Sequence, residues 1–168
     1  MKFSELKGRA VVSLDDAKKI GEVEDLMVDP LSRRIVSLKV RIGMFKAAQL
    51  VSATDVKNVG ADAVTLTTNS LLTATPADAA GSDTASAAGA PAAVELTRIL
   101  GAKVVRDAGT LVGELKDVVI DWSTLEITGY EVREVGMFAK AQEFTATPDV
   151  RFSDKITTMP AELLSQPA

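Results

Sequence analysis

One short pattern occurs twice in this chain and constrains its fold more than any other feature. Residues 21–29 read Gly-Glu-Val-Glu-Asp-Leu-Met-Val-Asp, and residues 113–121 read Gly-Glu-Leu-Lys-Asp-Val-Val-Ile-Asp, an offset of 92 residues. With single-residue gaps near Asp16 and Gly43, the match extends over most of each half of the chain. The repeat predicts two copies of one small module.

The repeat also predicts where the modules begin and end. We place the first copy at residues 1–73 and the second at residues 95–168, so that each has roughly 70 residues, a length at which a hydrophobic core is thin. The interval 74–94 is rich in alanine and is broken by proline and glycine, which favours a flexible linker over a helix. A coil of this length spans on the order of 25 Å, enough for the copies to pair within one chain or between chains.

Alternating side chains predict a strand at the same place in each copy. Val36, Leu38 and Val40 alternate with polar residues, and the second copy shows a similar alternation over residues 128–133. A period of two indicates one buried face. This pattern therefore predicts strands, with Val36 on the buried side.

The runs before these strands, residues 22–28 and 114–120, lead into turns that begin with Asp29 and Asp121. An aspartate at the start of a turn accepts hydrogen bonds from backbone N–H groups two residues on, so a hairpin is expected in each copy. Shorter strands are expected at residues 9–13, 63–67, 102–106 and 155–158. Five or six short strands in some 70 residues favour an all-β fold of two small closed barrels, because closure hides the sheet edges.

Composition excludes several kinds of chemistry. The sequence has no cysteine and no histidine, which rules out disulfides, thiolate nucleophiles, Cys/His zinc sites and imidazole acid-base catalysis. The net charge is −4, divided as +2 over residues 1–73, −2 over residues 74–94 and −4 over residues 95–168. An acidic total weighs against binding DNA through its phosphates, and leaves RNA or an anionic membrane only as peripheral partners of the first copy.

Two further absences concern location. No apolar run approaches the roughly 18 residues that cross a bilayer, and the first eight residues lack the apolar core of a secretory signal. We therefore expect a cytoplasmic protein, with peripheral attachment to a membrane as the alternative.

Three features of each copy resemble the PRC-barrel family. Gly-x-x-Val-Val, at residues 8–12 and 101–105, leads to Gly-Glu-hydrophobic-x-Asp and an apolar pair ending in aspartate, and then to a turn and an alternating strand. Residues 55–65 are similar to the family's closing helical turn and strand, whereas the counterpart around residues 149–158 is shorter. The family includes the cytoplasmic domain of the purple-bacterial reaction-centre H subunit and the C-terminal domain of a ribosome maturation factor.

This resemblance implies a barrel that serves as an adaptor and has no activity of its own. Members bind other proteins or, in the H subunit, lie at a membrane and influence electron and proton transfer elsewhere. The sequence shows neither the transmembrane helix of the H subunit nor the additional domain of the ribosome factor, so we expect a free-standing tandem of barrels. Photosynthesis and ribosome maturation are both unsupported.

Repeated carboxylates are the only candidates for catalysis or metal binding. Oxygen-only sets suit Ca²⁺ or Mg²⁺, and an acid pair can perform acid-base work if both groups converge on one substrate. On a strand, however, side chains three positions apart point to opposite faces, and an aspartate in a turn has a structural role. The structural interpretation is therefore favoured for the two sets, Glu22, Asp25 and Asp29 with Glu114, Asp117 and Asp121.

A basic cluster in the first copy is a candidate contact surface. An anionic partner could bind there, the cluster could be a solvated exterior, or it could meet the second copy, which has acidic residues at Glu126, Glu131 and Glu134. The sequence leaves these three alternatives open. The cluster consists of Arg33, Arg34, Lys39, Arg41 and Lys46.

A methionine and a phenylalanine follow a polar strand end in both copies, as Met44-Phe45 and Met137-Phe138. Exposed, these side chains would suit partner recognition; buried, they would close a barrel end or lie between the copies. The latter interpretation is favoured because each core is small. Trp122 and Tyr130, present only in the second copy, could anchor a partner, although a core role is favoured.

No glycine-rich phosphate loop is present, and neither a nucleotide, a flavin nor another cofactor is indicated. The sequence thus predicts a non-enzymatic adaptor or scaffold that binds an unidentified protein partner through its barrel surfaces, with intramolecular pairing of the barrels or a homodimer. The alternative is electrostatic association of the basic face with an RNA-protein or anionic membrane assembly.

Overall fold

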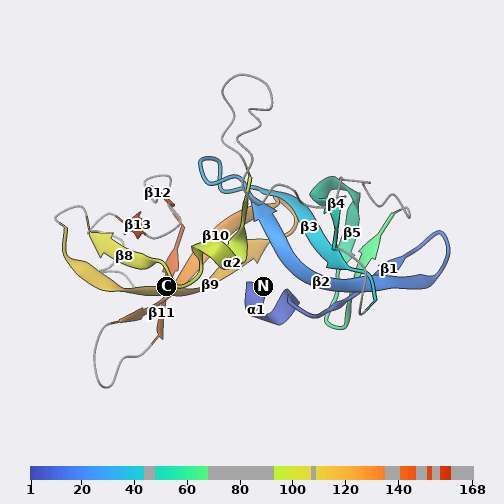
Figure 1. Cartoon of the computed structure of the whole chain (residues 1–168), viewed down its shortest axis with the longest axis horizontal. Coiled ribbons are helices and arrows are strands. Elements are labelled where there is room, and N and C mark those ends of the chain that lie inside the picture. The colour runs from blue at the N-terminus through green and yellow to red at the C-terminus, as the bar shows by residue number, and fades with distance from the viewer. Residues whose placement is uncertain are drawn as a thin grey trace.

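The computed structural model is a mostly β protein with two sheets and a few short helices (Figure 1). It describes residues 1–43, 48–67, 93–106, 109–134, 141–146, 151–152 and 156–159. Apart from β7, which joins the first sheet from the start of the second copy, each sheet is built from one copy of the repeat, and the two sheets lie side by side along the long axis of the molecule. The two sheets therefore draw mainly on different halves of the chain.

The first sheet has the strand order β4-β3-β2-β1-β6-β5, and a further strand, β7, pairs with β2. All neighbours are antiparallel except β1 and β6, which are parallel. A short 3₁₀ helix, η1 (Ala53–Asp55), connects β4 to β5. The strands are β1 (Ala10–Ser13), β2 (Lys18–Val28), β3 (Ile35–Arg41), β4 (Gln49–Ser52), β5 (Val56–Val59), β6 (Ala63–Leu66) and β7 (Val94–Glu95).

The second sheet repeats this order as β11-β10-β9-β8-β13-β12, again with one parallel pair, β8 and β13. Each first-copy strand on the sheet path thus has a counterpart in the second copy. The strands are β8 (Lys103–Arg106), β9 (Leu111–Asp121), β10 (Glu126–Glu134), β11 (Ala141–Thr145), β12 (Arg151–Phe152) and β13 (Ile156–Met159).

The predicted hairpins are confirmed as β2–β3 and β9–β10. The Oδ1 atom of Asp29 accepts a hydrogen bond from the backbone N–H of Leu31 at 2.9 Å, and Oδ1 of Asp121 accepts one from Ser123 at 2.8 Å. The four shorter predicted strands correspond to β1, β6, β8 and β13. Sequence reasoning did not identify β4, β5, β7, β11 and β12, nor the helices described below.

The prediction that Val36 is buried is wrong. The register of β2 and β3 pairs Met27 with Ser37 and Val28 with Ile35, so Val36 is the extra residue of a β-bulge. A bulge reverses the alternation of side chains, and Val36 is accordingly 47% exposed while Ser37 is buried. The second copy skips Thr128 in the same way.

The repeated glycine of the Gly-Glu motif has a packing reason. A Cβ atom on Gly21 would lie 2.3 Å from the carbonyl oxygen of Arg41, and one on Gly113 would lie 2.0 Å from that of Arg133. Both contacts are far shorter than van der Waals distance, so the backbones of the paired strands approach each other too closely here for any residue but glycine. The glycine of the motif is therefore required by the close approach of the adjacent strand's backbone.

The predicted linker lies outside the described residues as far as residue 92, and its last residue, Val94, opens β7. Within the described part of the chain, no helix has the length and apolar character needed to cross a bilayer.

Candidate functional site

The first segment of each copy packs on the sheet of the other copy. Each segment contains a four-residue helix, α1 (Phe3–Leu6) in the first copy and α2 (Leu96–Ile99) in the second. Helix α1 contacts β9, whereas α2 contacts β2. Figure 1 shows α1 at the centre of the molecule, between the two sheets. We call these segments, residues 1–6 and 94–99, the two arms.

Backbone pairing holds both arms in place. In one direction, Val94 and Glu95 pair with Val28 and Met27 of β2. In the other, Met1 and Ile120 exchange backbone hydrogen bonds of 3.1 and 2.8 Å, and Lys2 forms a bridge with Val119. The two pairings are equivalent under the repeat, so the contact has approximate two-fold symmetry.

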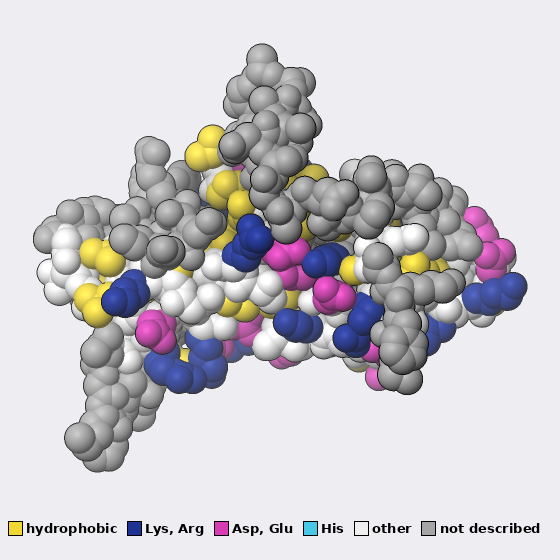
Figure 2. Space-filling model, viewed as in Figure 1, with side chains coloured by type: hydrophobic (Ala, Val, Ile, Leu, Met, Phe, Trp, Pro, Cys, Tyr) yellow, Lys and Arg dark blue, Asp and Glu magenta, His cyan; other side chains and the backbone are white. Residues whose placement is uncertain are grey.

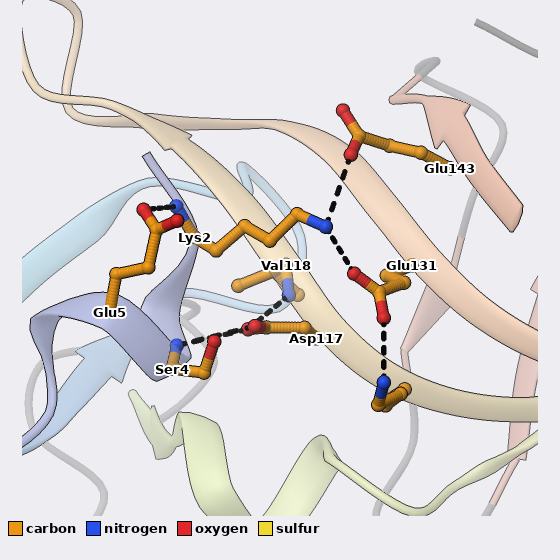
Figure 3. A network of polar contacts seen from close by, with 8 residues as sticks. Lys2, Ser4, Glu5, Asp117, Val118, Glu131 and Glu143 are labelled. Atoms are coloured by element: carbon orange, nitrogen blue, oxygen red, sulfur yellow. Dashed lines mark hydrogen bonds and ion pairs between the residues drawn. The ribbon is translucent and has the colours of Figure 1, made fainter. Parts of the chain in front are cut away.

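Two buried aspartates receive the helices of the arms. The carboxylate of Asp117 accepts a hydrogen bond from the backbone N–H of Ser4 at 3.2 Å (Figure 3). The carboxylate of Asp25 accepts one from the N–H of Thr97 at 3.2 Å and another from the Thr97 hydroxyl. Each aspartate satisfies a donor at the start of a helix, which has no partner within the helix. These repeated acids therefore connect the two copies.

Apolar side chains complete each arm. Phe3 and Leu6 of α1 are buried, as are Leu96 and Ile99 of α2. All four belong to one hydrophobic cluster that includes core residues of both sheets. Because each copy alone has a thin core, sharing apolar surface in this way stabilises both copies.

A cluster of opposite charges surrounds Lys39 of β3. The Nζ atom of Lys39 lies 2.8 Å from Oε1 of Glu95, on the arm of the second copy, and 3.4 Å from Oε1 of Glu24 on β2. The hydrogen bond to Glu95 is the main cause that raises the pKa of Lys39. We call these three residues the Lys39 cluster.

The second copy holds an equivalent cluster around Glu131 of β10. Its carboxylate is ion-paired with Lys2, on the arm of the first copy, and Oε1 lies 3.0 Å from Nζ of Lys116. Figure 3 shows Lys2 reaching across to Glu131 and to Glu143, whose Oε2 atom lies 3.5 Å from the Lys2 Nζ. The hydrogen bond from Lys2 is the main cause that lowers the pKa of Glu131. We call Lys2, Lys116 and Glu131 the Glu131 cluster.

The turns that follow β2 and β9 also meet. The backbone N–H of Ile35 donates to the carbonyl of Leu125 at 2.8 Å, and that of Ile127 donates to Arg33 at 3.1 Å. Between these two bonds, the backbones of Arg34 and Glu126 form an antiparallel β-bridge. Their side chains are also ion-paired, with Nε of Arg34 3.8 Å from Oε1 of Glu126. Residues 34 and 126 are equivalent in the repeat, so the approximate two-fold axis passes between them.

The basic residues predicted from sequence are thus distributed over different contacts. Arg34 and Lys39 are ion-paired with the second copy, Arg41 is 3.2 Å from Glu22 of its own sheet, and the backbone carbonyl of Arg33 contacts Ile127. In Figure 2, dark blue and magenta side chains are interspersed across the middle of this face. Lys46 lies outside the described residues, as do Met44, Phe45, Met137 and Phe138.

Five of the six repeated carboxylates have separate structural partners, and Glu114 is exposed. Asp29 and Asp121 accept hydrogen bonds from Ser32 and Ser123 within their turns, and these bonds lower the pKa of both carboxyl groups. Glu22 is bound by Lys19 and Arg41, with Lys19 the main cause of its lowered pKa. Among the described residues, no group of three or more acidic side chains is arranged to hold a metal ion.

Tyr130 lies in the interior, and Trp122 packs against the core from its edge. Tyr130 is fully buried, and burial raises the pKa of its hydroxyl, so the group stays protonated. Trp122 is half-buried and packs against the shared core.

Sequence reasoning missed the residues of the arms: Lys2, Ser4, Glu95 and Thr97. A signal was present, because Phe3-Ser4-Glu5-Leu6 and Leu96-Thr97-Arg98-Ile99 share an apolar, hydroxyl, charged, apolar order just ahead of the repeated glycines at positions 8 and 101. The repeat therefore begins earlier than the Gly-x-x-Val-Val pattern.

Comparison with known proteins identifies the first copy. Residues 1–72 match the PRC-barrel domain family. No curated protein matches the chain. The second sheet, β8 to β13, is present in the structure, but its residues 103–145 are not assigned to a family. Residues 1–72 of this chain are therefore a PRC-barrel domain.

Proposed function

We propose that this protein is a non-enzymatic adaptor or scaffold that binds a protein partner through surfaces that the contact between its two copies leaves exposed. In this proposal each sheet closes into a small barrel, and the second copy is a diverged PRC barrel. Closure of the first is supported by η1, which joins the two edge strands, β4 and β5, through only three residues. The same order of strands supports the second.

The observation that carries this proposal is the position of Asp25 and Asp117. An acid that works catalytically must reach a substrate, whereas these two carboxylates are buried and hydrogen-bonded to the arm of the opposite copy. Both therefore serve the assembly of a two-module body. Such a body presents two similar surfaces at a fixed spacing, which suits a scaffold.

An apolar turn makes the first copy the better candidate for the docking surface. Leu31, in the turn between β2 and β3, is 70% exposed, and Val36 lies just beyond this turn. At the equivalent positions the second copy has Ser123 and Thr128. Figure 2 shows yellow side chains at the surface over the β2–β3 turn. Exposed apolar groups of this kind contribute to protein-protein contacts when they gather.

Affinity capture of the tagged full chain at physiological salt tests this proposal. We expect a specific protein to be retained by the wild type, lost with the double substitution Leu31→Ser/Val36→Thr, and kept with Leu111→Ser. Leu111 is a matched control because it is an exposed leucine of the second copy. Equal retention by both variants, or no specific protein with the wild type, would contradict the proposal.

The alternative, electrostatic association with an RNA-protein or anionic membrane assembly, has less support. Arg34, Lys39 and Arg41 are each ion-paired with a glutamate, so their charges are largely compensated. Salt separates the two functions: electrostatic binding collapses as salt rises from low to physiological concentration, whereas apolar docking persists. Reversing Arg33 and Arg34 is a poor test, because Arg34 also supports the contact between the copies.

A catalytic role for the repeated carboxylates is the third candidate. Asp25→Asn and Asp117→Asn should leave any detectable activity and any metal-dependent stability unchanged. If both variants lost an activity or a metal-dependent stability that the wild type has, the catalytic role would be favoured over the adaptor.

A further inference from the structure

The two charge clusters are equivalent in position and opposite in sign. Lys39 and Glu131 occupy the same position of the repeat, and the same holds for Glu24 and Lys116 on the preceding strands. On the arms, Lys2 corresponds to Glu95, since each directly precedes its helix. The Lys39 cluster is therefore acid-base-acid, whereas the Glu131 cluster is base-acid-base.

The other anchors of the arms are largely interchangeable. Asp25 and Asp117 are identical and each accepts a backbone N–H, from Thr97 or Ser4. The backbone pairing of each arm has the same form on both sheets. The apolar anchors are Phe3 with Leu6 and Leu96 with Ile99, four side chains of similar character. Either arm therefore has the polar and backbone groups to pack on either sheet. The charged residues are the anchors that differ in sign between the two arms.

We propose that the inverted clusters restrict this contact to unlike copies, and so select pairing of the first copy with the second copy of the same chain. If a first copy packed on the first copy of another chain, Lys2 would lie beside Lys39. If two second copies paired, Glu95 would lie beside Glu131. Like charges brought together at a partly buried contact oppose association strongly, and specificity of this kind depends on the repulsion as much as on the attraction.

Arg34 and Glu126 add to the selection because they face each other at the approximate two-fold axis. Pairing of like copies would place Arg34 against Arg34 and Glu126 against Glu126. Both side chains are about half exposed, so their contribution is smaller than that of the two clusters.

Exchanging the charges of the arms tests the proposal. In Lys2→Glu/Glu95→Lys, each arm matches the sheet of its own kind of copy, while the net charge is unchanged. Two chains can then form a closed dimer with one contact between first copies and one between second copies, which preserves the number of contacts. We expect this variant to dimerise with rising concentration, whereas the wild type stays monomeric by light scattering.

A single cysteine reports which copies meet, because the wild-type chain has none. Residues 34 and 126 are directly opposite between two backbone hydrogen bonds, a geometry that brings Cβ atoms close enough for a disulfide. With oxidised glutathione as oxidant, Arg34→Cys alone should form a disulfide between chains only where first copies pair. We expect at least a tenfold increase of that product in the arm-exchange variant over the wild-type background.

Restoring the match should restore the monomer. Adding Lys39→Glu/Glu131→Lys to the arm exchange makes each arm opposite in charge to position 39 or 131 of the other copy again, and both the dimer and the disulfide between chains should disappear. The like charges that this places beside Glu24 and Lys116 lie within one sheet, so they weigh equally on the monomer and on the dimer. Lys39→Glu/Glu131→Lys without the arm exchange should dimerise like the arm exchange itself. The control Lys57→Glu/Glu114→Lys exchanges exposed charges outside the clusters and should stay monomeric.

The proposal fails if the arm-exchange variant stays monomeric, whether or not it is less stable. It also fails if Arg34→Cys links wild-type chains readily, or if the fourfold variant does not return to the monomer. Far-UV circular dichroism of each variant identifies any that does not fold, and the two independent double exchanges keep the test decisive.

Discussion

The two copies share their backbone architecture and carry opposite charges at several of the positions through which they touch each other. Positions at which a strand approaches another backbone or receives a helix are identical, as at Gly21 and Gly113 or Asp25 and Asp117. Positions that contact the other copy through charge are inverted, as at Lys39 and Glu131. The comparison teaches that a repeat can keep the residues that make its fold and change those that select its neighbour.

Substituting the shared glycines should have the largest effect on stability. Gly21→Ala and Gly113→Ala each place a Cβ atom against a carbonyl oxygen of the adjacent strand, so the backbone must move and the free energy of unfolding should fall by about 3 kcal/mol. Urea denaturation followed by circular dichroism measures the change.

Gly60→Ala is the matched control for this prediction. Its Cβ atom would lie 3.3 Å from the carbonyl oxygen of Ala63, a mild contact, and we expect a change within about 1 kcal/mol. Similar losses at Gly21 and Gly113 would show that the two copies use the motif alike. A loss at only one of them would break the equivalence.

Substituting the buried aspartates should have the second-largest effect on stability. Asp25→Ala and Asp117→Ala each leave buried N–H donors without an acceptor, which should lower the free energy of unfolding by about 2 kcal/mol. Asp25 also accepts the hydroxyl of Thr97, so its removal should cost about 1 kcal/mol more. Thermal unfolding of both variants checks the order, and a larger loss for Asp117→Ala would contradict it.

The inverted clusters predict opposite dependences on pH. The pKa of Glu131 is lowered, so its stabilisation is present above the usual value of 4.5 and is lost as pH falls through the folded-state pKa. The pKa of Lys39 is raised, so its stabilisation is present below the usual value of 10.5 and is lost as pH rises through the folded-state pKa. These signs follow from linkage between protonation and folding.

Melting temperature against pH measures this contrast. Glu131→Gln should reduce the loss of stability at acid pH, and Lys39→Gln should reduce it at alkaline pH. The acid effect should be partial, because the pKa values of Glu22, Asp29 and Asp121 are also lowered. If melting temperature depended on pH in both variants as it does in the wild type, the contributions assigned to Glu131 and Lys39 would be wrong.

The smallest effect on stability is expected in the turns. Leu31→Ser converts the exposed turn of the first copy to the serine of the second copy, and the free energy of unfolding should change by no more than about 0.5 kcal/mol. Its reciprocal, Ser123→Leu, should be equally mild. A large loss of stability with Leu31→Ser would show that this side chain belongs to the core rather than to an open surface.

Several parts of the fold could be predicted from local patterns. The hairpins follow from alternation and from an aspartate at the start of each turn, and the structure confirms both. The exposure of Val36 could not be predicted, because it depends on a bulge in the pairing of β2 with β3. The role of the arms also escaped sequence reasoning, because their contacts lie more than 70 residues apart.

What the sequence alone determined is that one module occurs twice, that its elements are strands, and that cysteine and histidine chemistry is absent. Only the tertiary structure decided that each arm crosses to the opposite sheet and that Lys2 meets Glu131 while Glu95 meets Lys39. The physical reason is the distance along the chain over which each interaction acts. Side-chain period and turn chemistry act over a few residues, whereas burial of a thin core and pairing of partly buried charges depend on which surfaces come together in space.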